Sequence, residues 1–293
     1  MRATKFFILV ALVGCGPASR NGNGDDTGTT DANPNGTGDG NPNSDGCTDA
    51  AKLVYVVDQN NQLSTFDPAT KTFHDLGTLN CPAQAGGTPF SMGIDRNATA
   101  WVEYSTSELF KVDTTSLACT KTSFHSSSLA QFGMGFSTDT AGGTTDSLFI
   151  AGGAGPSQPS SQLAKLDTTT MVATNVATVT GWPELTGTGN AELWGFFPSD
   201  STGSTTPKVE KVNKATGAPA TTWSLPTLQG MPTAWAFAFW GGDYWIFLAK
   251  DFDLSTTVYQ IDGTSGTIKG TTPTNTRTIV GAGVSTCAPV VIF

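Results

Sequence analysis

Five carboxylate residues that could take part in hydrolysis follow or flank short apolar segments. They are Asp95, Asp139, Glu184, Glu192 and Asp243. Glycoside hydrolases use two carboxyl groups at a defined separation, and Trp182 and Trp240, close to two of these residues in sequence, could stack on sugar rings. Asp is also common in turns after strands, so these positions fit turns as well as a catalytic pair.

Other catalytic residue types are scarce. The chain has 2 histidines, His74 in an expected outer strand and His125 in a serine-rich stretch, and it has no Gly-x-Ser-x-Gly sequence. A Ser-His-Asp hydrolase is therefore not expected. Zinc-protease, phosphate-loop and dinucleotide motifs are absent from the sequence, and we expect neither a cofactor nor a metal.

A sequence motif that occurs five times predicts the elements that must position these side chains. Each copy is a strand-like segment, then Asp or Asn, then a turn. The polar positions lie 46 to 54 residues apart, at Asp67, Asp113, Asp167, Asn213 and Asp262. A period of this size built from short strands is typical of a radial or stacked repeat.

One unit shows the expected strands clearly. Residues 89–95, 100–104, 108–112 and 117–124 are strand-like segments separated by short polar turns. Four antiparallel strands joined in this way make a propeller blade. In a later unit, period-two alternation places Trp235, Phe237 and Phe239 on one face, where we expect them to lie between blades rather than to form a sugar platform.

The two ends of the folded region complement each other. It begins at 52–57 with a segment that resembles the second strand of a unit. It ends at 280–286 with a segment that resembles the first strand of a unit. We therefore expect an all-β propeller of five blades of four antiparallel strands, closed by the C-terminal strand. A sixth blade would require a strand pair hidden in 152–162, and a β-sandwich is the other fold that the spacing permits.

Residues 53–58 and 63–70 resemble a widespread bacterial repeat, roughly LYxVDxxxxLxxxDPxTG, that occurs in secreted β-propellers. The resemblance covers all five units in degenerate form, with the final Gly only at Gly217 and, displaced, at Gly266. Together with the N-terminal features below, it implies a surface propeller lipoprotein of Gram-negative bacteria. Propellers of this kind serve as binding surfaces, scaffolds and enzymes, so the fold does not decide the function.

The N-terminus predicts export and lipidation. Arg2 and Lys5 precede a short apolar run, 6–13, which ends in a lipobox-like segment at Cys15. We expect residues 1–15 to be a lipoprotein signal peptide with lipidation of Cys15, 16–46 a disordered Gly/Asn/Asp/Thr tether, and 47–293 the propeller. Gly16 favours the outer membrane, with the protein facing either the periplasm or the cell surface.

The charge and cysteine content of the chain limit the classes of partner that we expect. The chain carries 24 acidic and 15 basic residues, and its folded part has no Lys/Arg cluster, so nucleic-acid binding is not expected. With Cys15 lipidated, four cysteines remain, and their positions favour the disulfides Cys47–Cys287 and Cys81–Cys119 among three pairings. We expect membrane attachment through the N-terminal lipid only, and a monomer.

The favoured function is a non-catalytic binding or scaffolding module for an envelope protein or glycan. Two short segments, 182–184 and 240–243, combine a Trp with a carboxylate, and a third, 95–96, is an Asp-Arg pair; together they are expected to form the binding rim. The residues expected to contact the ligand are Asp95, Arg96, Trp182, Glu184, Trp240 and Asp243. A glycoside hydrolase with carboxylates at the mouth of the channel is the alternative.

Overall fold

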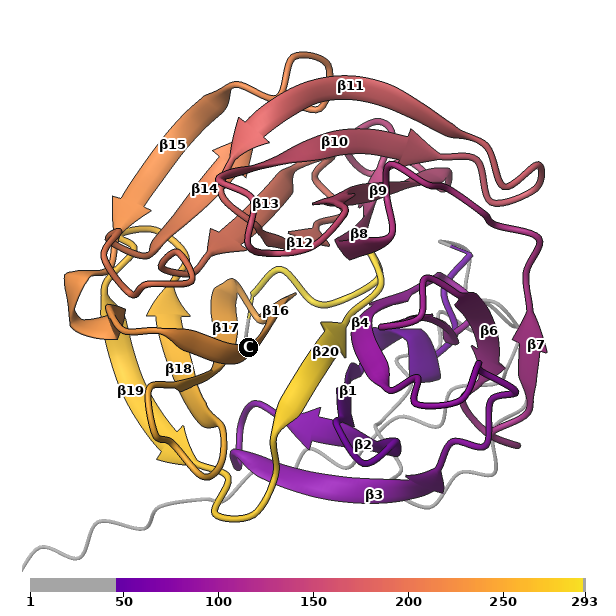
Figure 1. Ribbon diagram of the computed structural model, residues 1–293, viewed down its shortest axis with the longest axis horizontal. Coiled ribbons are helices and arrows are strands. Elements are labelled where there is room, and N and C mark those ends of the chain that lie inside the picture. The colour runs from indigo at the N-terminus through magenta and orange to yellow at the C-terminus, as the bar shows by residue number, and fades with distance from the viewer. Residues whose placement is uncertain (1–45, 292–293) are drawn as a thin grey trace, which may run out of the picture. The chain divides into compact units, whose positions relative to one another are not determined.

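The computed structural model describes residues 46–291, which form five four-stranded antiparallel sheets arranged in a ring (Figure 1). The predicted five-bladed propeller is therefore confirmed. The predicted signal peptide and all of the tether except Gly46 lie outside the described residues. Among residues 46–291, no helix is long and apolar enough to cross a membrane.

For each blade, the first strand named lies nearest the axis and the last strand named lies on the outside of the ring (Figure 1). Blade 1 contains β20 (Ile279–Gly283), β1 (Val54–Asp58), β2 (Gln62–Asp67) and β3 (Thr72–Thr78). Blade 2 contains β4 (Pro89–Ile94), β5 (Thr99–Tyr104), β6 (Leu109–Asp113) and β7 (Cys119–Lys121). Blade 3 contains β8 (Gln131–Thr138), β9 (Asp146–Gly153), β10 (Ser160–Leu166) and β11 (Ala173–Thr180).

The last two blades follow the same order. Blade 4 contains β12 (Glu184–Gly187), β13 (Leu193–Phe197), β14 (Lys208–Val212) and β15 (Pro219–Ser224). Blade 5 contains β16 (Pro232–Trp240), β17 (Asp243–Lys250), β18 (Thr257–Asp262) and β19 (Ile268–Pro273). Two short 3-10 helices, η1 (Ala50–Lys52) and η2 (Pro226–Leu228), lie outside the sheets. Because β9 pairs directly with β10, residues 152–162 contain no sixth blade.

The recurring Asp or Asn of the sequence repeat caps the turn between the third and outer strands. Asp113 Oδ1 accepts the backbone N–H groups of Thr115 and Ser116 at 2.9 and 2.7 Å, and these bonds lower the pKa of its carboxyl. Four residues after each repeat Asp or Asn, the backbone is left-handed, and only Gly217 and Gly266 are glycine there. Gly266 is thus equivalent to Gly217, and the displacement inferred from the sequence is wrong.

The core lies between neighbouring blades. Phe237 and Phe239 of blade 5 are buried against Trp194 and Phe196 of blade 4, and Trp235 joins this cluster while half-buried. The predicted packing of these three aromatic residues between blades is confirmed. Large apolar side chains fill the wedge between twisted sheets, so burial of this surface holds adjacent blades together.

The inner strands run side by side in the same direction. A Cβ on Gly133 would lie 2.2 Å from the carbonyl oxygen of Pro183, and one on Gly187 would lie 2.1 Å from that of Phe136. The beginnings of β8 and β12 are therefore adjacent, and so are their ends. We call the rim where the inner strands begin the N rim, and the rim where they end the C rim.

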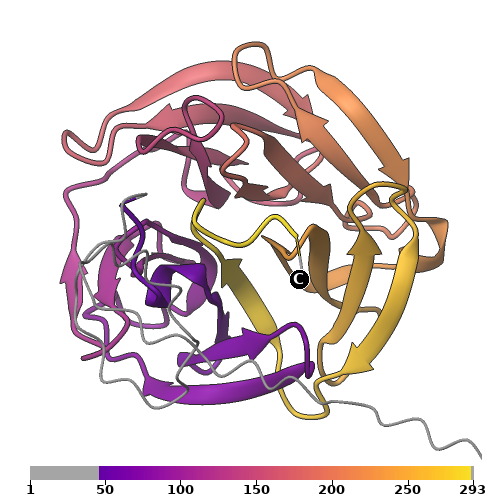
Figure 2. The same cartoon turned by 180° about the vertical axis from the view of Figure 1, so that it is seen from behind.

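Closure of the ring joins the two ends of the propeller. In Figures 1 and 2 β20 lies beside β1, and the pairing matches Tyr55 with Gly283. Beyond β20, on the C rim, Cys287 forms a disulfide with Cys47, and Ser285 Oγ donates to the Ala51 carbonyl at 2.7 Å. The second disulfide joins Cys81 to Cys119. Both favoured pairings and the C-terminal closure are confirmed.

We predict that replacing Cys47 and Cys287 together by Ser lowers the free energy of unfolding by up to about 5 kcal/mol, through loop-closure entropy. The sequence separation of this pair is 240 residues, against 38 for Cys81–Cys119. The matched Cys81/Cys119 double Ser variant should lose up to about 4 kcal/mol. Urea unfolding followed by tryptophan fluorescence measures both, and a larger loss for the shorter loop would contradict the closing role.

Candidate functional site

A buried polar contact on the axis joins three blades. Glu184, the first residue of β12, accepts a hydrogen bond on Oε2 from Ser91 Oγ of β4 at 2.8 Å. Ser91 Oγ also accepts the backbone N–H of Met134 in β8 at 3.2 Å. Blade 3 lies between blades 2 and 4 in the ring, so Glu184 reaches past the adjacent blade to the next one.

Glycines of β8 allow this approach. A Cβ on Gly133 would also lie 2.8 Å from the Cα of Glu184, and one on Gly135 would lie 2.7 Å from the carbonyl group of Leu185. Such distances are below any normal contact of a Cβ with backbone atoms. The two glycines therefore determine how close β12 lies to β8, and with it the position of the Glu184 carboxyl group.

A second carboxyl group lies behind the first. Glu103 of β5 is paired with Ser91 across the blade and is fully buried. Within residues 46–291, neither of its carboxyl oxygens has a hydrogen-bond partner. We call Glu103 and Glu184 the axial acid pair, since the charge of one acts on the other.

Both carboxyl groups favour the neutral form. Burial raises the pKa of the Glu103 carboxyl well above its ordinary value of 4.5, and the charge of Glu184 raises it further. Burial likewise raises the pKa of Glu184 well above 4.5, and its hydrogen bond with Ser91 opposes this shift only in part. A charged carboxylate in apolar surroundings destabilises the folded state unless a hydrogen-bond donor or a cation pairs with it.

A pocket on the N rim opens above Glu184, and we call it the axial pocket. Its volume is about 190 Å³. It is lined by residues from blades 1, 2, 4 and 5: Gln59, Thr88, Pro89, Phe90, Glu184, Thr233, Ala234, Trp235 and Val280. Phe90 and Trp235 are half-buried, and no lining residue is Lys, Arg or His.

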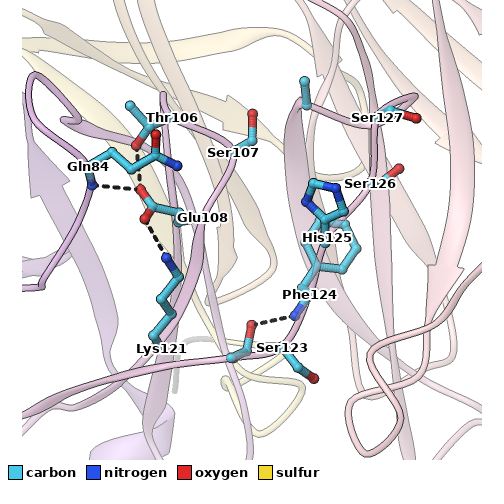
Figure 3. A pocket seen from close by; sticks show the side chains of 12 residues that line it. Gln84, Thr106, Ser107, Glu108, Lys121, Ser123, Phe124, His125, Ser126 and Ser127 are labelled. Carbon is cyan, nitrogen blue, oxygen red and sulfur yellow. Dashed lines mark hydrogen bonds and ion pairs between the residues drawn. The ribbon is translucent and has the colours of Figure 1, made fainter.

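A larger pocket of about 490 Å³ lies away from the axis, between blades 2 and 3 (Figure 3). The carboxyl group of Glu108, the acid in this pocket, has three hydrogen-bond donors. It accepts hydrogen bonds from Lys121 Nζ at 2.7 Å, Thr106 Oγ1 at 2.6 Å and the Gln84 N–H at 3.0 Å. His125 is exposed and makes no hydrogen bond within the described part of the chain. Because the charge of Glu108 is already neutralised by Lys121, this pocket is a weaker candidate than the axial one.

Two of the six residues expected to bind a ligand belong to the N rim. Glu184 lines the axial pocket, and Trp182 precedes it in the loop before β12. Trp182 is buried, and its indole N–H lacks a hydrogen-bond partner among residues 46–291. Of these two residues, only Glu184 therefore lines the pocket.

The other four expected residues end or follow inner strands, and so lie on the C rim. Asp95 caps a turn and accepts Trp101 Nε1 at 3.2 Å, while Arg96 Nε donates to Asp146 at 3.1 Å. Trp240 Nε1 donates to the Lys52 carbonyl at 2.9 Å. Asp243 accepts Lys269 Nζ at 2.9 Å. The six residues do not form one surface, and their role in binding stays a prediction.

The carboxylates considered for hydrolysis are divided in the same way. Asp139 and Glu192 also lie on the C rim, where Asp139 accepts Ser147 Oγ and Glu192 accepts Lys211 Nζ. Only Glu184 lies on the N rim. Sequence reasoning missed Glu103, although a Glu between Val102 and Tyr104 in a strand of otherwise large apolar residues is a detectable signal.

Comparison with known proteins extends only to the fold. No protein-family model matches the chain, and no curated protein matches its sequence. A structure of the mitotic checkpoint complex is 10% identical with a TM-score of 0.39, covering 78% of this chain and 65% of that one. TolB from Acinetobacter baumannii is 12% identical with a TM-score of 0.44, covering 75% of this chain and 52% of TolB.

A protein of unknown function from Bacteroides caccae is 11% identical with a TM-score of 0.41, covering 76% of this chain and 73% of that one. The chain thus spans less than two thirds of the checkpoint chain and about half of TolB. Similarity at this level carries no argument about function. The fold is compatible with a binding or scaffolding module.

We predict that Gly133→Ala destabilises the protein by about 1–3 kcal/mol or more, since the new methyl group meets backbone atoms of β12. Gly155→Ala is the matched control, because the nearest atom to a Cβ there lies 4.0 Å away. Urea unfolding of both variants tests the close approach. Equal stabilities would show that β12 does not lie against β8 as described.

We predict that Glu103→Leu raises the free energy of unfolding at pH 7 by about 1–3 kcal/mol, because it removes a buried polar group without hydrogen bonds. The folded chain keeps the Glu103 proton above pH 4.5, whereas the unfolded chain releases it. Wild-type stability should therefore fall as the pH rises from about 5 to 8, by at most about 1.4 kcal/mol per pH unit for each such group. Glu103→Leu should reduce this slope.

The control for that prediction is Glu108→Leu, which removes a carboxyl with three hydrogen bonds and should destabilise at every pH. Urea unfolding from pH 5 to 8 gives both results. A loss of stability in Glu103→Leu as large as in Glu108→Leu, with an unchanged slope, would contradict the unpaired state of Glu103.

Proposed function

We propose that this chain is a non-catalytic binding module of the cell envelope, anchored by a lipid on Cys15, which receives a protein partner on its N rim. The observation that carries the proposal is the combination, on one rim, of the axial pocket and an exposed apolar turn. The proposal includes an outer-membrane location and a monomeric chain.

The exposed turn joins β17 to β18. Phe252 and Leu254 are 91% and 96% exposed. The Asp251 N–H donates to the Met231 carbonyl at 2.7 Å, and Met231 is itself 42% exposed. Because Met231 directly precedes β16, whose residues 233–235 line the axial pocket, the turn adjoins the pocket. Large apolar side chains gathered on a surface favour a protein partner over a polar ligand.

The attachment point of the tether supports the same orientation. The segment that leads toward Cys15 enters the fold at Cys47, which is bonded to Cys287 on the C rim. The Thr48 N–H lies 3.5 Å from the carbonyl of Arg96, just past the end of β4. The described chain therefore begins at the rim opposite the pocket.

The alternative, a glycoside hydrolase, needs two carboxyl groups that both reach the substrate. Glu184 is the only acid among the residues that line the axial pocket. Glu103, its nearest carboxyl neighbour on the axis, is fully buried and does not line the pocket. This geometry favours binding over hydrolysis.

We predict that a photo-reactive amino acid placed at Gln59, an exposed residue that lines the axial pocket, crosslinks the full-length chain to one defined envelope protein in intact Gram-negative cells. Phe252→Ser combined with Leu254→Ser should reduce this product at least tenfold, since it removes the apolar contact. The matched control is Val172→Ser, an equally polar change at a residue that is 58% exposed in the turn between β10 and β11. Equal crosslinking in all three chains would contradict the proposed docking surface.

We also predict that the full-length chain incorporates a labelled fatty acid and that Cys15→Ala abolishes incorporation. Lipidation requires the thiol of this cysteine, so the variant should be exported without an anchor. Gel fluorescence of alkyne-labelled cells measures incorporation. Label retained in Cys15→Ala would contradict the anchor.

A further inference from the structure

We propose that the axial pocket receives a single cationic side chain of the docked protein, an ammonium or guanidinium group, and holds it against Glu184. This inference rests on the proposed function, because it names the chemistry by which the N rim recognises its partner.

The axial acid pair differs from the other buried glutamates in its ion pairing. Glu108 is paired with Lys121 at 2.7 Å, and Glu210 with Lys208 at 2.8 Å. Neither member of the axial acid pair has an ion-pair partner within residues 46–291. The two other buried glutamates are thus each paired with a lysine, and a partner's cation would supply the equivalent pairing on the axis.

The carboxyl oxygens of the axial acid pair have few hydrogen-bond donors. Of the four carboxyl oxygens of the axial acid pair, Glu184 Oε2 accepts the Ser91 hydroxyl, whose oxygen itself accepts the Met134 N–H. Both oxygens of Glu103 lack a partner among the described residues. An ammonium or guanidinium group brings several donors and a positive charge, and it would let Glu184 ionise.

The size and the lining of the axial pocket suit a cationic side chain. At about 190 Å³ it is smaller than usual pockets for drug-sized ligands, so it suits one slender side chain. The half-buried rings of Phe90 and Trp235 line it, and aromatic faces attract cations. No lysine, arginine or histidine in its lining would repel the incoming charge.

The test uses the purified full-length chain in detergent, with n-butylammonium as the probe and n-butanol and glucose as neutral counterparts. Ligand-observed NMR gives the relative affinities. We expect n-butylammonium to bind at least tenfold more tightly than n-butanol, and Glu184→Gln to remove this preference. Asp253→Asn, an acid on the same rim that does not line the pocket, should keep it.

A second pair of variants does not alter the buried site. Thr233 is exposed and lines the pocket, so Thr233→Lys can place the chain's own ammonium group above Glu184. It should abolish n-butylammonium binding, whereas the neutral, similarly long Thr233→Met should weaken it less than Thr233→Lys does.

Several outcomes would overturn the inference. Binding of n-butanol or glucose as tight as that of n-butylammonium would make this a site for neutral ligands. Absence of binding by any probe to the folded wild-type chain, or equal binding by Thr233→Lys and Thr233→Met, would also exclude a cation site. If the Gln59 crosslink persists in those cases, the docking function stands and only the cationic recognition fails.

Discussion

The pairing of β20 with β1 is the interaction on which the remaining architecture depends. It places residues 279–283 against a strand more than two hundred positions earlier in the chain, and the Cys47–Cys287 disulfide holds the ends beside it. Without it the first blade would lack its inner strand, and the axis would be open on one side. The axial pocket exists only because four blades contribute to its wall, so its geometry is a consequence of closure.

Closure also explains how a fold built from apolar strands can hold two carboxyl groups at its centre. Glycines in β8 bring β12 close to its neighbour, and Glu184 then reaches Ser91 on a blade beyond it. Rigid strands fix these side chains, whereas the loops of the N rim are free to vary around them. Retaining Glu103 without a hydrogen-bond partner costs stability, which is the kind of local conflict that marks functional positions.

Much of this fold is predictable from the sequence because its signals are local and repeated. An Asp or Asn in the turn before each outer strand marks every blade, and the mismatched strand types at the two ends predict closure. The candidate site is less predictable. Asp95 follows one inner strand and Trp240 ends another, whereas Glu184 begins one, and only tracing strand direction assigns them to opposite rims. Glu103 interrupts an apolar strand in the sequence, but its burial and its lack of a hydrogen-bond partner within the described residues follow only from the folded structure.

The central claim is that the N rim is the binding face. Hydrogen exchange of the full-length chain, alone and with the protein crosslinked through Gln59, tests it most directly. The account predicts slower exchange of backbone amides in residues 231–235 and 251–254 on binding, with the C-rim turns at 95–98 and 240–243 unchanged. Protection confined to those C-rim turns would contradict it and move the binding face to the opposite rim.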